Sequence, residues 1–406
     1  MLKCIAVADL CVGMYIHEFC GAWMDHPFWK SRFLLKSEKD LQRIRASSIG
    51  ELWIDVSKGL DVTEGTPSVS PEDVAAAAEA SLLAAVQSRP VSQGVAMEDE
   101  LQRAVKLCAN AKAAVISMFG DARMGQALQF EQAGELVEEI SDSVLRHPNA
   151  LISLARLKNA DEYTYMHSVA VCALMIALAR QLGLNEALVR EAGLAGLLHD
   201  IGKMAIPDAV LNKPGKLTDS EFATVRDHPV AGSHMLLESK QLSSLVLDVC
   251  LHHHEKMDGS GYPHRLAGEQ ISLYARMGAV CDVYDAITSN RPYKAGWDPA
   301  ESIRKMAEWK GHFDPEVFQA FVKTVGIYPV GSLVRLESGR IGVVMEQQAR
   351  SLLAPKVKVF FSAKSKTPIA QETLDLARLV GRDRIVARES AADWGFQHLN
   401  ELWSGL

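Results

Sequence analysis

The stretch Leu197-Leu198-His199-Asp200-Ile201-Gly202-Lys203 places a histidine beside an aspartate at the end of an apolar helical pattern. Helical periodicity extends outward from it over residues 148 to about 325, with interruptions at the Gly/Pro-rich loops 213–216 and 258–263. A continuous pattern of roughly 180 residues predicts an all-α helical bundle as the centre of the chain.

Two β-rich regions are expected on either side of this bundle. Residues 1 to about 65 contain short apolar runs broken by Gly and Asp, with one amphipathic helix expected at 38–47. After Tyr328 the pattern alternates between apolar and polar residues, which predicts strands at 332–336, 341–346 and 357–361. The predicted fold class is therefore mainly α, with a small β-rich N-terminal domain and a short β appendage at the C-terminus.

The expected domain limits follow these changes of pattern. Between the first two regions lies a turn-rich and Ala-rich segment, expected as a partly ordered helix or a mobile connector. The limits are 1–65 for the β-rich domain, 66–98 for a linker, 99–147 for connecting helices, 148–325 for the helical domain, and 326–406 for the β appendage and C-terminal tail.

Composition excludes several classes of protein. The 406 residues include 43 Lys plus Arg against 50 Asp plus Glu, a net charge of -7, which argues against a nucleic-acid polymer as partner. Seven cysteines occur singly, as in a reducing compartment. The longest apolar run, 169–179, is shorter than the roughly 20 residues of a membrane span. A cytoplasmic protein is expected.

Histidines are concentrated in the helical region. Eight of the 13 lie between His167 and His264, where about three would be expected from even spacing. Histidine and aspartate occur on five successive helical segments, at His167, His199-Asp200, His228, His252-His253-His254 and Asp282. Mixed imidazole and carboxylate donors suit Fe, Mn, Zn or Ni. These segments contain no cysteine cluster, which argues against a structural zinc site.

Several of these motifs resemble a known family. His199-Asp200 resembles the doublet that defines the HD phosphohydrolase superfamily, and residues 254–263, His-Glu-Lys-Met-Asp-Gly-Ser-Gly-Tyr-Pro, resemble the HD-GYP family. Members of that family hydrolyse the bacterial second messenger cyclic di-GMP. The run 282–294 is similar to a further signature of the family, and residues 1 to about 65, including 12–16, resemble an uncharacterised domain often found ahead of HD-GYP domains.

The resemblance implies a centre of two divalent metal ions. One ion would be held by His167, His199, Asp200 and Asp282, and Asp200 would bridge to a second ion held by His228, His253 and His254. Family members with a third metal carry a Glu four residues before the first of these histidines, where this chain has Tyr163. Iron or manganese is the expected metal, with Ni, Zn and Mg as alternatives.

The resemblance also implies roles for the surrounding residues. A hydroxide that bridges the two metals would attack phosphorus, with Asp200 and Lys203 as the catalytic residues. The residues expected to bind substrate are Lys203, Tyr262, Arg291 and Lys294, because Lys and Arg side chains donate to phosphate oxygens. Asp285 would hydrogen-bond to a metal ligand on the side that faces away from the metal. The loop around Tyr262 would present that ring to the substrate, or order the site and recruit partner proteins.

The expected function is a cytoplasmic phosphodiesterase that converts cyclic di-GMP to pGpG, and in a second step to GMP if the centre allows it. The expected partners are cyclic di-GMP, a diguanylate cyclase with a GGDEF domain or another signalling protein, and a second copy of the chain. Two alternatives stay open. The protein could be a non-catalytic module that binds a cyclic dinucleotide, or a phosphodiesterase for another cyclic dinucleotide.

Overall fold

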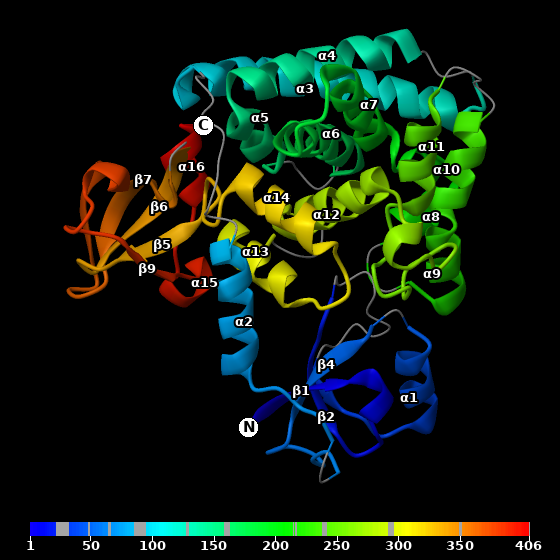
Figure 1. The fold of residues 1–406 in the computed structure, drawn as a ribbon, viewed down its shortest axis with the longest axis horizontal. Helices are drawn as coiled ribbons and strands as arrows, with labels where there is room; N and C mark the ends of the chain where they lie inside the picture. The colour runs from blue at the N-terminus through cyan, green and yellow to red at the C-terminus, as the bar shows by residue number, and fades with distance from the viewer. Residues whose placement is uncertain are drawn as a thin grey trace.

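The computed structural model of the chain describes residues 1–21, 32–47, 49–63, 66–84, 95–126, 130–157, 163–213, 215, 217–237, 242–290, 296–348 and 351–405. Within these ranges a helical bundle forms the centre of the molecule, and a β-sheet lies on each of two different sides of it (Figure 1). The predicted fold class, mainly α with β regions at both ends of the chain, is confirmed.

The N-terminal region forms a four-stranded antiparallel sheet with the strand order β1-β4-β2-β3. Its elements are β1 (Leu2–Ala6), β2 (Tyr15–Phe19), β3 (Phe33–Leu34), α1 (Glu38–Arg45) and β4 (Glu51–Asp55). Helix α1 begins after Ser37, whose hydroxyl accepts from the amide of Asp40, and it buries Leu41 and Ile44 against the sheet. This region therefore has a hydrophobic core of its own.

Helix α2 (Pro71–Ala84) forms within the segment that was expected as a partly ordered helix or a mobile connector. It packs against α13 (Figure 1), and Leu82 is fully buried in the core of the bundle. Glu79 forms an ion pair of 3.1 Å with Arg388 of the C-terminal sheet. The described part of this segment is thus a packed helix that lies between the two β regions.

The bundle is built around α6 (Tyr163–Gln181), in which residues 169–176 are all buried. A helix that is apolar on every side must be surrounded by other elements, and α3, α4, α5, α7 and α12 pack around it. The remaining helical bounds are α3 (Met97–Arg123), α4 (Phe130–Arg146), α5 (Pro148–Ala155), α7 (Glu186–Leu198), η5 (Ile201–Ala205), α8 (Asp208–Leu211), α9 (Asp219–Arg226), α10 (His228–Leu237), α11 (Ser244–His252), α12 (Leu273–Thr288), α13 (Pro299–Glu308) and α14 (Pro315–Val325).

Helices α6 and α7 approach closely because of a glycine. A Cβ atom at Gly196 would lie 2.9 Å from the carbonyl oxygen of Val171, which is shorter than real Cβ contacts. Any larger residue would push the helices apart. The close approach brings His199, at the C-terminal end of α7, next to His167 on α6.

The C-terminal region is a five-stranded antiparallel sheet with the order β8-β7-β6-β5-β9. Its elements are β5 (Leu333–Leu336), β6 (Arg340–Gln348), β7 (Ser351–Ser362), β8 (Thr367–Asp375), β9 (Ile385–Arg388), α15 (Ala391–Trp394) and α16 (Leu399–Ser404). Strands β5, β6 and β7 were predicted, whereas β8 and β9 were not. Most of β8 is exposed, so its residues are largely polar and lack the apolar alternation of a half-buried strand. No helix within the described ranges is long and apolar enough to cross a membrane.

Candidate metal centre

The seven side chains expected as metal ligands meet in the middle of the helical bundle. His167, His199 and Asp282, from α6, the end of α7 and α12, form a group that we call the inner triad. His228, at the start of α10, and His253 and His254, just after α11, form the outer triad. Within each triad the candidate ligand atoms all lie within 4.8 Å of one another.

Asp200 lies between the two triads and directs one carboxylate oxygen toward each. Its Oδ2 atom is 3.5 Å from Nε2 of His167 and 3.4 Å from Nε2 of His199, both in the inner triad. Its Oδ1 atom is 3.2 Å from Nε2 of His228 and 3.8 Å from Nε2 of His253, both in the outer triad. One carboxylate is therefore placed to bridge two cations.

Backbone carbonyls set the tautomer of three of the histidines. A carbonyl oxygen can only accept, so each Nδ1 carries a proton and each Nε2 is the ring nitrogen that faces the centre. The accepting carbonyls belong to Gly196 for His199 (2.8 Å), Val225 for His228 (2.7 Å) and Cys250 for His253 (3.0 Å). This outward hydrogen bond is typical of metal-binding histidines.

A carboxylate takes the place of the carbonyl at His167. Oδ2 of Asp285 lies 2.6 Å from Nδ1 of His167, and the hydroxyl of Ser289 donates to Oδ1 of Asp285 at 3.3 Å. Asp285 is nearly one turn beyond Asp282 on α12, so a single helix carries both a candidate ligand and the support of another ligand. The structure thus places Asp285 behind His167 of the inner triad.

The donor set fits a divalent cation. Nε2 of His199, Oδ1 of Asp200 and Oδ2 of Asp282 are buried and have no hydrogen-bond partner among the residues that the structure describes. Leaving such atoms unpaired in the interior is costly, and buried polar groups in native proteins are nearly always satisfied. Oδ1 of Asp200 faces the outer triad and Nε2 of His199 belongs to the inner one. Coordination of cations would satisfy these atoms together.

The ionisation of the cluster agrees with this interpretation. Burial acts to raise the pKa of Asp200, but Lys203 and His199 outweigh it and hold that pKa well below its usual value. Burial, together with the charges of His199 and His228, lowers the pKa of His253 to about 3. Ionised carboxylates and neutral imidazoles are the forms that bind metals.

His199 differs from its neighbours. Burial acts to lower its pKa, yet Asp200 and Asp282 raise that pKa to about 10. The two carboxylates therefore attract a positive charge to this position, and a cation bound there would take the place of the proton.

Lys203 lies at the edge of the cluster on the short helix η5. Its ammonium group donates to Oδ2 of Asp200, and the side chain is 16% exposed. Helix η5 packs directly against α10, because a Cβ atom at Gly202 would lie 1.9 Å from the carbonyl oxygen of His228. The lack of a side chain at Gly202 thus sets the distance between Asp200 and the first residue of the outer triad.

The loop that follows the outer triad covers His254. The ring of Tyr262 stacks on His254 with centroids 4.6 Å apart and planes at 26°. Glu255 is buried, and its carboxylate accepts from the amides of His264 (2.7 Å) and Leu266 (3.0 Å). The sequence interpretation missed Glu255, although its position directly after two candidate ligands was a signal that it could order this loop.

Several residues considered in the sequence are either outside the described ranges or lie away from the triads. Arg291 and Lys294 lie outside the described residues, as do residues 161–162 and the side chain of Tyr163. His234 is exposed on α10. His252 points away from the triads, with Nδ1 2.7 Å from Asp248 and Nε2 3.0 Å from His264.

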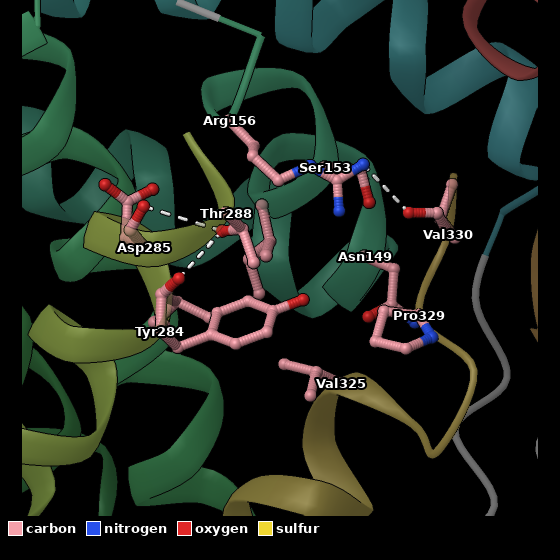
Figure 2. Close-up of a pocket in the computed structure, with 11 residues that line it drawn as sticks. Asn149, Ser153, Arg156, Tyr284, Asp285, Thr288, Val325, Pro329 and Val330 are labelled. Carbon is pink, nitrogen blue, oxygen red and sulfur yellow. Dashed lines mark hydrogen bonds between the residues drawn. The ribbon is translucent and has the colours of Figure 1, made fainter. Parts of the chain in front are cut away.

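A small polar pocket lies beside α12, α5 and α14 (Figure 2). In it Arg156 donates to the carbonyl of Val330, and Thr288 donates to the carbonyl of Tyr284. One of the residues that line it, Asp285, contacts the inner triad through His167. The pocket has room for about one water molecule and is too small for a nucleotide.

Two family models match successive parts of the chain. Residues 2–133 match a family described as a domain of unknown function (DUF3391), and residues 127–317 match the HD domain. The chain is 65% identical over 407 residues to cyclic di-GMP phosphodiesterase PA4108 of Pseudomonas aeruginosa. That alignment covers 100% of this chain and 96% of the relative.

More distant relatives match shorter stretches of the chain. The cyclic di-GMP phosphodiesterase response regulator RpfG of Xanthomonas campestris is 38% identical over 222 residues, which cover 50% of this chain and 57% of that protein. The 3'3'-cGAMP-specific phosphodiesterase 1 of Vibrio cholerae is 38% identical over 164 residues, which cover 40% of this chain and 38% of that protein. Since the first relative is similar over its whole length and the HD-domain match spans the Gly261-Tyr262-Pro263 motif, the chain belongs to the HD-GYP family.

Proposed function

We propose that the protein is a metal-dependent phosphodiesterase that hydrolyses cyclic di-GMP to pGpG. The observation that carries this proposal is the 65% identity, over the whole chain, to a cyclic di-GMP phosphodiesterase. The geometry of the two triads supports it, because Asp200 is placed to bridge two cations in a buried cluster of imidazoles and carboxylates. The proposed ligands are the seven triad and bridging residues.

The proposed cofactors are two divalent ions, iron or manganese in preference to Ni, Zn or Mg. Bound at the triads, they would supply the positive charge that activates water and stabilises an in-line displacement at phosphorus. Asp282 contributes to both sides of the centre, because its Oδ1 is 2.9 Å from Nε2 of His167 and its Oδ2 is 3.8 Å from Nδ1 of His254.

Lys203 is proposed to hold the reactive phosphate. Its ammonium group lies beside Asp200 at the border of the cluster and is partly exposed, so it can also donate to a phosphate oxygen at the centre. A fixed positive charge there stabilises the negative charge that develops on the phosphate in the transition state. The attacking oxygen comes from water, and the 3′ oxygen of the ribose leaves.

A second candidate substrate is a mixed guanine–adenine cyclic dinucleotide. The relatives that are specific for 3'3'-cGAMP are 36–39% identical over 148–169 residues, in the same range of identity as several cyclic di-GMP phosphodiesterases. The cations at the triads would bind only the phosphodiester group. Discrimination between these two substrates therefore depends on residues that contact the bases.

Product analysis by chromatography tests the function. Reduced protein loaded with Mn or Fe(II) is mixed with cyclic di-GMP, beside a His199→Ala/Asp200→Ala variant and a His234→Ala control, which removes an exposed histidine of α10. We expect the wild type and the control to form pGpG and the double variant to form none. Absence of turnover by wild-type protein with two metals bound would contradict the enzyme assignment, and bound but uncut nucleotide would then indicate a binding module.

We also propose the cellular compartment of this activity, its regulatory domain and its protein partners. The protein would act in the cytoplasm, since the seven cysteines are free thiols. The β-rich N-terminal domain, residues 1–65, would receive a signal, and the loop around Tyr262 would contact a diguanylate cyclase or a second copy of the chain. Crosslinking with and without a GGDEF-domain protein, followed by mass measurement, tests these contacts.

A further inference from the structure

Arg226 is a cation at the rim of the outer triad. Its guanidinium carbon lies over the ring of Tyr262, 4.4 Å from the centroid, and that ring stacks in turn on His254. The side chain is partly exposed. Among the described residues, no carboxylate lies within ion-pair distance of it. The donors of Arg226 are therefore available to a ligand.

The position of Arg226 is tied to the outer triad at two points. Its side chain contacts Tyr262, which packs on His254. Its neighbour Val225 accepts a hydrogen bond of 2.7 Å from Nδ1 of His228. The N-terminus of helix α9 is stabilised by a capping box, in which the side chains of Thr218 and Glu221 each accept a hydrogen bond from the backbone amide of the other residue. The guanidinium thus has a defined place relative to the cations that would bind the substrate.

Arg226 and Lys203 serve different parts of a substrate. Lys203 pairs with Asp200 in the centre of the cluster, where the reactive phosphate would bind. Arg226 does not pair with Asp200 and lies against an aromatic ring at the rim. The planar fork of arginine matches the O6 and N7 acceptors of guanine, and it can also stack on a base. Adenine presents an amino group in place of O6, which cannot accept from the fork.

We propose that Arg226 is a specificity-determining residue that donates to O6 and N7 of one guanine of the substrate. This inference rests on the proposed function, because it assumes that a guanine dinucleotide binds at the triads. It assigns to Tyr262 a positioning role, since that ring is in contact with both His254 and Arg226.

The test compares Arg226→Met and Arg226→Lys with an Arg190→Met control, which removes an exposed arginine from α7. Turnover is measured with cyclic di-GMP and with bis(p-nitrophenyl) phosphate, a phosphodiester without bases. Dissociation constants are measured for cyclic di-GMP and cyclic di-AMP. Metal content is determined for every variant, so that a loss of cofactor is detected.

We expect Arg226→Met to raise KM for cyclic di-GMP by roughly tenfold or more while kcat changes by less than about threefold. The preference for cyclic di-GMP over cyclic di-AMP should fall by a similar factor. Arg226→Lys should behave like Arg226→Met, since a lysine lacks the fork. Cleavage of bis(p-nitrophenyl) phosphate, the metal content and the Arg190→Met control should match the wild type.

Four results would overturn the proposal. Unchanged constants for Arg226→Met would show that the residue does not contact the nucleotide. An equal loss for cyclic di-GMP and cyclic di-AMP would assign it to a phosphate, and a loss of metal or of bis(p-nitrophenyl) phosphate cleavage would assign it to support of His254. If wild-type protein cleaves bis(p-nitrophenyl) phosphate but not cyclic di-GMP, the proposed function is wrong. The dissociation constants for cyclic di-GMP and cyclic di-AMP then test by themselves whether Arg226 binds guanine. Absence of nucleotide binding would overturn both.

Discussion

The inner and outer triads contain similar donors but are held in place in different ways. The inner triad joins three helices of the core, and His167 and His199 are each 1% exposed. The outer triad comes from two helix ends, and the side chain of His254 is 10% exposed under the loop that carries Tyr262. Helix packing therefore fixes the inner site, whereas loop contacts complete the outer one. We expect the outer cation to exchange faster.

The largest effect is expected at the residue that the two triads share. Asp200→Ala removes the carboxylate that lies between the two triads and directs one oxygen toward each, so kcat for cyclic di-GMP should fall on the order of 10³-fold or more. Metal content, measured by mass spectrometry, should fall below two ions per chain. A variant that kept two ions and a tenth of the activity would show that the triads are independent of Asp200.

A substitution at Gly202 tests how far the distance between the two triads depends on the packing of η5 against α10. A Cβ atom there would meet the carbonyl oxygen of His228 at 1.9 Å and the amide nitrogen of Gly232 at 2.4 Å, so the backbone must move. Gly202→Ala should lower the free energy of unfolding by about 1–3 kcal/mol and reduce activity, because Asp200 shifts relative to His228.

Gly134→Ala is the matched control for thermal unfolding. Gly134 lies within α4, and a Cβ atom there would meet nothing within 4 Å. The exchange should leave stability unchanged or raise it by up to about 1 kcal/mol. Similar unfolding temperatures for both variants would contradict direct packing of η5 against α10.

The inner triad alone is addressed through Asp285. Asp285→Asn removes the negative charge that holds Nδ1 of His167, and supports of this kind contribute about 10–100-fold to metal affinity. The expected result is weaker retention of one of the two ions, measured by competition with a chelator.

Asp248→Asn provides the comparison for this measurement. Asp248 makes an equivalent contact of 2.7 Å to Nδ1 of His252, which belongs to neither triad. Metal retention should be that of the wild type. Equal losses in the two variants would show that the Asp285 contact has no special role in the inner triad.

The smallest effect is expected at the outer triad. Tyr262→Leu removes the ring stacked on His254, and such contacts contribute about 0.5–1.5 kcal/mol, which is up to about tenfold in affinity. Tyr262→Phe keeps the ring and should retain metal like the wild type. If phenylalanine fails to restore retention, the hydroxyl group and not the stack supports the outer site.

The helices and the donor residues could be predicted because their signals are local. Apolar periodicity identifies a helix within one segment, and His199-Asp200 or His253-His254 are adjacent in the chain. The positions of α2 and Arg226 could not be predicted in this way. Leu82 is buried by helices that come later in the sequence. Arg226 could be identified as a candidate binding residue only from its contact with Tyr262.

The sequence by itself determined the helical class, the β regions at both ends and the set of imidazole and carboxylate donors. The tertiary structure decided which side chains lie beside and behind these donors. His167 and Asp285 are 118 residues apart, and they meet only because α6 and α12 pack together. The physical reason is that secondary structure follows short-range periodicity, whereas a metal centre depends on which helix ends the packed core brings within a few ångströms of each other.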